Sequence, residues 1–226
     1  MSDAFFKYPA TPYLTVFPGV DVRDDKIFSD DERETFLTHS LTVEEKIDGA
    51  NLGISFDSEG NLRAQNRGGY VDLPGVGQWG PLEQWLRPRA DLLFECLLDR
   101  FILFGEWCFA THSIRYDQLP DWFIGFDVFD KCTGRFLSCV RRNMLLAKIG
   151  ISNVPFIAHG HFTLAELERL LTKSRYATLA AEGLYLRYDD GDWLKARAKM
   201  VRVEFVQSIG QHWSKGAFRT NLLHRR

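Results

Sequence analysis

A lysine and a carboxylate one residue apart form the strongest candidate for chemistry in the chain, within Glu45-Lys46-Ile47-Asp48-Gly49. A lysine amine attacks an electrophile only when it is neutral, and at a reference pKa of ~10.4 only about 0.04% of the side chain is neutral at pH 7. A catalytic Lys46 therefore requires surroundings that lower its pKa. The alternative is that Lys46 and Asp48 form a solvated turn at the end of a strand.

Several further segments that combine glycine with charged or aromatic residues follow Lys46 along the chain. They are Gln65-Asn66-Arg67-Gly68-Gly69, Phe104-Gly105-Glu106-Trp107, Phe123-Ile124-Gly125-Phe126-Asp127 and Glu182-Gly183-Leu184-Tyr185, ahead of the basic run Leu194-Lys195-Ala196-Arg197-Ala198-Lys199-Met200-Val201. Each has an ordinary structural explanation, such as a loop at Arg67 or a core position at Phe126. Glu106 stands out, because an unpaired carboxylate within an apolar strand is costly, so it needs either a ligand or an internal salt bridge.

The elements that must position these residues are mainly antiparallel strands. Turn-forming residues at 57–61 and 189–192 predict two hairpins, one over 52–66 and one joining strands 184–188 and 194–201. Further strands are expected at 41–45, 101–109 and 122–129. Because side chains alternate along a strand, Lys195, Arg197 and Lys199 are expected to share one face.

Helices are expected at four places between or beside these strands. Ser29 with Glu32, and Thr163 with Glu166, are capping boxes that predict a helix through about Thr38 and another from Thr163. A helical pattern over 82–98 is interrupted near Pro88, and one over 140–149 ends at a glycine. With no linker or repeat dividing the chain, we expect one α+β domain over residues 1–226.

The composition restricts the protein class and its partners. The 226 residues are 45% hydrophobic and 26% charged, as in a globular protein, and the net charge is −2. A nucleic-acid partner would therefore have to bind a local basic surface. The four cysteines lack C-x-x-C spacing, and His159 with His161 lacks a third ligand, so we expect reduced, mostly buried thiols and no zinc site. No signal peptide or spanning segment is visible, which predicts a cytoplasmic protein.

The ordered set of segments resembles the covalent nucleotidyltransferases, and most closely the ATP-dependent RNA ligases that seal nicks. The resemblance covers nearly the whole chain and implies a nucleotidyltransferase (adenylation) domain. In that family a lysine, here Lys46, attacks the α-phosphorus of ATP, releases pyrophosphate and holds AMP. The AMP then passes to an RNA 5′-phosphate, and a 3′-hydroxyl displaces it. After Lys199 only 226 − 199 = 27 residues remain, so no C-terminal OB-fold is expected.

The resemblance also assigns nucleotide-binding roles. The backbone of Glu45 would meet the adenine, Asp48 matches the usual acid of the lysine motif, and Asn51 matches an asparagine near the reacting phosphate. Arg67, with Arg63 as the fallback, would contact the ribose or a phosphate, for which a guanidinium fork is suited. For Glu106 the resemblance implies a contact with a ribose hydroxyl, and for Phe126 it implies stacking on the adenine.

The resemblance places the charged groups of the phosphate site in the last strands. Glu182 would bring a carboxylate to a catalytic Mg²⁺, with Mn²⁺ possible in its place, while ATP oxygens and waters complete the metal's ligands. Lys195, Arg197 and Lys199 could converge on the phosphates. Arg197 stands where many relatives have lysine, which leaves open the cation that contacts the α-phosphate. Arg197, Lys199 and the metal are the groups expected to lower the Lys46 pKa.

Two rival functions remain open from the sequence. A capping-type guanylyltransferase or a DNA ligase core would share the lysine motif, but both append a barrel. A retired nucleotide- or RNA-binding module would keep the fold without turnover, against which Lys46, Glu106, Glu182 and Lys199 are all present. The expected partner is RNA, either a nicked duplex or broken ends, and a partner protein that supplies end recognition also remains open.

Overall fold

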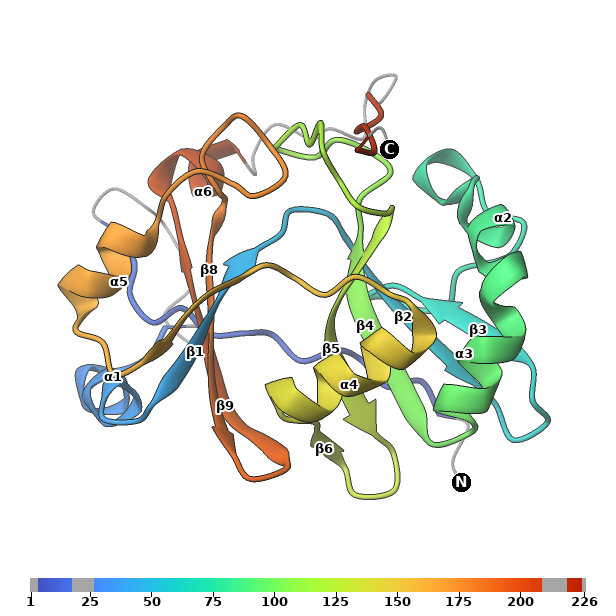
Figure 1. Cartoon of the computed structure of the whole chain (residues 1–226), viewed down its shortest axis with the longest axis horizontal. Helices are drawn as coiled ribbons and strands as arrows, with labels where there is room; N and C mark the ends of the chain where they lie inside the picture. Colours follow the sequence, from blue (N-terminus) through green and yellow to red (C-terminus); the bar gives the residue numbers. More distant parts are fainter. Residues whose placement is uncertain (1–3, 18–26, 209–218, 225–226) are drawn as a thin grey trace.

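Two antiparallel sheets form the centre of the protein, with helices on their flanks (Figure 1). This computed structural model describes residues 4–17, 27–208 and 219–224. The first sheet has the order β7-β1-β8-β9 and the second β3-β2-β4-β5-β6. The strands are β1 (Leu41–Lys46), β2 (Ala50–Phe56), β3 (Leu62–Gln65), β4 (Phe101–Trp107), β5 (Phe123–Asp130), β6 (Arg135–Phe136), β7 (Phe156–Gly160), β8 (Gly183–Asp190) and β9 (Trp193–Val201).

The chain crosses from one sheet to the other immediately after Lys46. Strand β1 ends at Lys46 and β2 begins at Ala50, so three residues make the crossing. Gly49 permits the close approach, because a Cβ there would lie 3.0 Å from the Trp107 carbonyl oxygen and 3.1 Å from the Cβ of Glu106. Lys46 is thereby held at the junction of the two sheets.

Helices cover the outer sides of both sheets. Next to the first sheet lie α1 (Asp30–Leu37) and α5 (Leu164–Leu170), which bury Phe36 and Leu167 in a core with strand residues. The remaining helical segments are η2 (Gly77–Trp79), α2 (Leu82–Leu86), η3 (Arg87–Arg89), α3 (Ala90–Leu97), α4 (Cys139–Ile149) and α6 (Val203–Ser208). Of these, α2, α3 and α4 supply residues to the core of the second sheet. Apolar side chains on one helix face therefore seal each sheet from water.

Buried charges tie the two sheets together. Asp127 on β5 accepts hydrogen bonds from Arg187 on β8, from Arg197 on β9 at 2.8 Å and from the Tyr8 hydroxyl at 2.5 Å. Burial alone would raise the pKa of Asp127, but Arg187 and Arg197 outweigh it, so the pKa is lowered and the carboxylate stays ionised. Such a network demands one relative placement of the strands that carry it.

The predicted α+β class with antiparallel sheets is confirmed, as are both hairpins and both capping boxes. The break near Pro88 appears as η3, and α4 ends at Gly150 in the left-handed region, with φ 73°. Strand β7 was not predicted. It is an edge strand with little burial, and therefore lacks the apolar alternation that identifies strands in a sequence.

The expectation of reduced, mostly buried thiols agrees with the structure, whereas the expected absence of a zinc site stays a prediction. All four cysteines are free thiols, and Cys132 alone is exposed. His159 hydrogen-bonds Ser40 and Thr42, and no described residues form a group of three or more metal-ligating acidic, histidine or cysteine side chains. Within the described chain no helix is long and apolar enough to cross a bilayer. The single-domain and cytoplasmic assignments stay predictions.

Candidate active site

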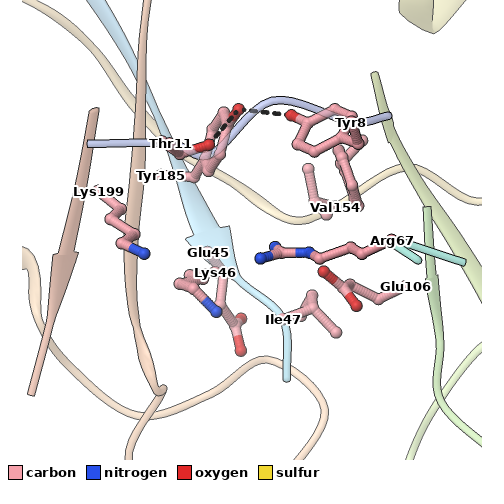
Figure 2. A pocket seen from close by; sticks show the side chains of 11 residues that line it. Tyr8, Thr11, Glu45, Lys46, Ile47, Arg67, Glu106, Val154, Tyr185 and Lys199 are labelled. Atoms are coloured by element: carbon pink, nitrogen blue, oxygen red, sulfur yellow. Dashed lines mark hydrogen bonds between the residues drawn. The ribbon is translucent and has the colours of Figure 1, made fainter. Parts of the chain in front are cut away.

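A pocket opens between the two sheets at the end of β1, around Lys46 (Figure 2). Its cavity volume is about 50 Å³, within about 520 Å³ of space that includes open solvent. The pocket is narrow because the Arg67 guanidinium reaches into it from the loop after β3, as Figure 2 shows. Its lining residues are Tyr8, Thr11, Glu45, Lys46, Ile47, Arg67, Glu106, Phe126, Val154, Tyr185 and Lys199.

Lys46 forms an ion pair with Glu182, the residue immediately before β8. The strand register pairs Lys46 with Gly183 and so places Glu182, the residue before Gly183, beside the Lys46 amine. The distance from Lys46 Nζ to the Glu182 carboxylate is 2.5 Å. Burial by itself would lower the pKa of Lys46, but the charges of Glu182 and Glu106 outweigh it, and the pKa is raised. The expectation that neighbouring cations lower this pKa is therefore wrong for the protein in this state, in which Lys46 is a paired ammonium.

Glu106 projects from β4 into the same pocket and has a buried oxygen with nothing to bond. Its Oε2 has no hydrogen-bond partner in the described part of the chain, and Glu106 forms no ion pair there. The internal salt bridge considered from the sequence is therefore not formed. Burial raises the pKa of Glu106 to about 8, against the opposing charges of Lys46 and Arg67. A neutral carboxyl group at pH 7 can both donate and accept a hydrogen bond.

The opposite part of the pocket is apolar. Phe126 is buried on β5 and packs edge-to-face on Tyr8 with ring centroids 5.3 Å apart. Val154 and Ile47, both buried, complete this wall. The sequence did not identify five of the lining residues, which are Tyr8, Thr11, Ile47, Val154 and Tyr185. Tyr8 lies in the segment 7–14, which shares the family resemblance but carries no recognised chemistry, and apolar Val154 gives no signal of its own.

Glu45 lies in the pocket, but its carboxylate is turned away toward a neighbouring loop. The carboxylate accepts hydrogen bonds from the Ser174 hydroxyl at 2.5 Å and from the Arg175 N–H at 2.8 Å. Its own backbone N–H donates to the Pro155 carbonyl at 2.9 Å. Burial raises the pKa of Glu45, although both hydrogen bonds oppose the shift. The backbone carbonyl is thus the group that remains for a contact with a bound base.

Asp48 does not line the pocket, and the nucleotide contact expected for it stays a prediction. Its Oδ2 accepts hydrogen bonds from the backbone N–H groups of Ser113 at 2.6 Å and Ile114 at 2.9 Å. Its own N–H donates to the Tyr116 hydroxyl at 2.8 Å. Asp48 therefore fastens the loop after β4 to the sheet crossing, and acts on the site through the position of Lys46.

The structure does not bring together the three cations of β9. The expectation that Lys195, Arg197 and Lys199 converge on the phosphates is therefore wrong. Lys199 lines the pocket, with its ammonium 4.0 Å from the Tyr13 ring centroid. Arg197 is held by Asp127 and Tyr8, and exposed Lys195 pairs with Asp190 at 3.3 Å and lines a different groove beside α1. Residues 195 and 199 are four strand steps apart, roughly 13 Å, which is too far for one phosphate chain to engage both easily.

A second pocket adjoins the first and shares Lys46, Arg67 and Glu106 with it. Its cavity volume is about 360 Å³. Asn51 on β2 lines it, and both polar atoms of its buried side-chain amide lack partners in the described structure. Asn51 is therefore a site residue in position, as predicted, although in the second pocket and not the first.

The matched family and the similar structures agree with this geometry. Residues 39–201 match the family model described as RNA ligase. A search of curated proteins found no match. Among solved structures, a Naegleria gruberi RNA ligase mutant with ATP and Mn is 18% identical with a TM-score of 0.61, covering 77% of this chain and 53% of that one.

Two further Naegleria gruberi RNA ligase structures match over more of the chain. Another mutant with ATP and Mn is 16% identical with a TM-score of 0.62, covering 92% of this chain and 64% of that one. The same ligase with PPi is 16% identical with a TM-score of 0.61, covering 92% and 65%. This chain thus spans between about half and two thirds of those proteins. The family match covers most of the sequence, and the chain belongs to the RNA ligase family.

Proposed function

We propose that this chain is an ATP-dependent RNA ligase that carries AMP on Lys46. The observation that carries the proposal is the composition of the pocket at the sheet junction. There a lysine ion-paired to Glu182 lies beside a buried, unpartnered Glu106 oxygen, and an apolar wall faces both. Proteins rarely leave a buried carboxyl oxygen without a partner, so a ligand hydroxyl that bonds it is the expected occupant.

Each part of an adenine nucleotide has a counterpart in this pocket. The flat base fits between Phe126 and the aliphatic side chains of Ile47 and Val154. A ribose hydroxyl can satisfy the buried oxygen of Glu106. Arg67 and Lys199 supply positive charge for the phosphates, and the exposed Arg67 side chain can move aside to admit the base.

Lys46 must lose both its partner and its proton before it can act. The Naegleria ligase structures contain ATP and Mn, and here Glu182 is the carboxylate that would hold a divalent cation, together with phosphate oxygens and waters. Such a cation would supply positive charge to the reacting phosphates. Once Glu182 is engaged elsewhere, burial is left as the main influence on Lys46 and favours the neutral amine.

Two group transfers then follow on the same atom. The neutral Lys46 Nζ forms a bond to the α-phosphorus of ATP, pyrophosphate leaves with the electron pair of the broken P–O bond, and the nitrogen loses a proton. An oxygen of an RNA 5′-phosphate next bonds that phosphorus, and Nζ leaves and regains a proton. Finally a 3′-hydroxyl displaces AMP to seal the strand.

The substrate and partners belong to the same proposal. Membership of the RNA ligase family supports RNA as the substrate. We infer that the substrate is a nicked duplex or broken RNA ends and that the reaction serves RNA repair. The family match counts against the capping-type guanylyltransferase and the DNA ligase core that the sequence left open, and the labelling experiment below tests the retired binding module. A partner protein for end recognition and a cytoplasmic location also remain open as proposals.

Covalent labelling tests the proposal directly. The protein is incubated with radiolabelled ATP, GTP or NAD and a magnesium salt, then run on a denaturing gel. ATP should label the wild-type protein, and Lys46→Ala should abolish the label while the melting temperature stays close to that of wild type. Label from GTP or NAD alone, or label retained by Lys46→Ala, would reject the assignment.

Two lysines of β9 provide a matched pair of variants for the phosphate site. Lys199→Ala removes a pocket cation and should lower the rate of adenylation by at least about tenfold, the size of a lost charge-assisted hydrogen bond. Lys195→Ala removes an exposed cation paired with Asp190 and should leave the rate within about twofold. Equal effects of the two variants would show that the strand's cations act together after all.

A further inference from the structure

The second pocket, which shares Lys46 with the first but contains none of the residues of the apolar wall, has polar groups that the proposed nucleotide contacts leave unused. Its residues come from β2, from the loop over 66–80 and from the loop after β4. They are Lys46, Gly49, Ala50, Asn51, Asn66, Arg67, Gly68, Gln78, Trp79, Glu106 and His112. The two cations and three amides among them make this pocket suited to an anion.

Two hydrogen bonds anchor Gln78, one through its backbone carbonyl and one through its side-chain oxygen. The Trp107 indole N–H donates to the Gln78 backbone carbonyl at 2.7 Å, which anchors the short helix η2 to β4. The His112 Nε2 lies 3.0 Å from the Gln78 side-chain oxygen. With Nε2 protonated, His112 donates this bond, and the amide NH₂ of Gln78 is left with two donors and no partner in the described structure.

Asn51 provides the independent observation that a ligand is missing. Its side-chain amide is buried, lines the same pocket, and makes no hydrogen bond through either polar atom to any described residue. A buried amide without partners is destabilising unless a ligand or water satisfies it. The donors of Asn51 and Gln78 and the charges of Lys46 and Arg67 thus border one cavity.

We propose that this second pocket binds the 5′-phosphate of the RNA strand, with Gln78 as a binding residue and His112 as the residue that positions it. The inference rests on the proposed function. In the AMP transfer step an oxygen of the RNA 5′-phosphate forms a bond to the α-phosphorus while the P–N bond to Lys46 breaks. The Lys46 nitrogen leaves with the electron pair and takes up one proton. The attacking phosphate must therefore lie within reach of Lys46 but outside the space that AMP fills, and the second pocket meets both conditions.

The phosphate monoester is favoured over an uncharged ligand by the charge of the lining. At this step Lys46 carries AMP and is uncharged, so the cation that faces the phosphate is Arg67, and burial favours the neutral form of Glu106, whose pKa is about 8. Amide N–H donors bind phosphate oxygens without adding charge, and Gln78 is anchored through its hydrogen bonds with Trp107 and His112. Half-buried Trp79 lines the same cavity and offers an apolar surface beside the phosphate position.

The test separates AMP transfer from adenylation. Wild-type, Gln78→Ala, Gln78→Glu and His112→Ala proteins are loaded with labelled AMP, freed of ATP, and mixed with increasing concentrations of 5′-phosphorylated nicked RNA duplex in single-turnover reactions. The control is Gln84→Ala, which removes an exposed glutamine from the neighbouring helix α2. Melting temperatures identify any variant that has lost its fold.

We expect Gln78→Ala to load AMP within about twofold of wild type and to need at least about tenfold more RNA for half-maximal transfer. Gln78→Glu, of nearly the same size, should be weaker still because it places a carboxylate against the phosphate. His112→Ala should follow Gln78→Ala, and Gln84→Ala should match wild type. A nicked duplex with a 5′-hydroxyl should compete poorly with the 5′-phosphorylated duplex for wild-type protein. It should compete no worse for the Gln78→Ala protein.

Two results would overturn the inference. Transfer by both Gln78 variants at the wild-type RNA concentration dependence would show that the pocket does not bind the 5′-phosphate. A parallel loss of AMP loading and transfer would assign the pocket to the pyrophosphate part of ATP. Failure of the wild-type protein to take label from ATP would instead refute the proposed function itself, so the two failures are distinguishable.

Discussion

Replacing Glu106 by glutamine should make the protein more stable at alkaline pH and should weaken the dependence of its stability on pH. The folded-state pKa of Glu106 is about 8, against an ordinary value of 4.5, and burial is the main cause. The stability contributed by its proton is therefore complete below about pH 4.5 and is lost as the pH rises to about 8. Over that whole range the loss is about 5 kcal/mol, and between pH 6 and pH 8 it is about 2 kcal/mol.

Urea unfolding followed by tryptophan fluorescence measures this effect at several pH values between 5 and 9. Glutamine has nearly the shape of the protonated carboxyl group, so the difference between Glu106→Gln and wild type should be small at pH 5 and should grow by about 2 kcal/mol from pH 6 to pH 8. The control is Glu95→Gln on the exposed face of α3, for which the difference from wild type should not vary with pH.

The same variant tests the ligand assignment of the buried oxygen. If a ribose hydroxyl satisfies Glu106, Glu106→Gln should adenylate more slowly while it is more stable, a combination that a purely structural carboxylate does not produce. A stability difference that is independent of pH would refute the reasoning, since it would show that Glu106 is ionised in the folded protein at neutral pH.

Three further predictions follow from the structure. The kcat/KM for ATP, which reports the free protein, should rise with pH above 7 because the Lys46 pKa is raised there, and Glu182→Gln should move that rise to lower pH by removing the main charge responsible, as a normalised pH profile would show. Gly105→Ala should lower the free energy of unfolding by about 1–3 kcal/mol, because its Cβ would lie 2.4 Å from the Phe123 ring, while Gly69→Ala, with nothing within 4 Å, should change it by less than about 0.5 kcal/mol in urea titrations. Sealing of a pre-adenylylated nick should exceed joining of free ends and fall steeply across a salt series, because the net charge of −2 leaves RNA binding to a few phosphate contacts; equal joining of both substrates would contradict it.

Local signals in the sequence were sufficient for most of the secondary structure. The capping boxes at Ser29 and Thr163, the turns of the two hairpins and the helix stop at Gly150 depend on residues within a few positions of one another. Such short-range chemistry can be seen before any tertiary contact is known. Edge strand β7 lacked a local signal, because it has little burial and therefore no alternation of apolar and polar residues.

The family resemblance carried by the sequence also identified several residues that gather at the site, since Lys46, Arg67, Glu106, Phe126 and Lys199 all line the pocket. Only the tertiary structure decided what those residues are paired with. The strand register brings Glu182 to Lys46 and reverses the expected direction of its pKa shift. Packing of the two sheets commits Arg197 to Asp127, and strand geometry leaves Lys195 outside the pocket. Side-chain charge is a property of one residue, whereas its effect depends on distance and burial, and these arise only when distant segments pack together.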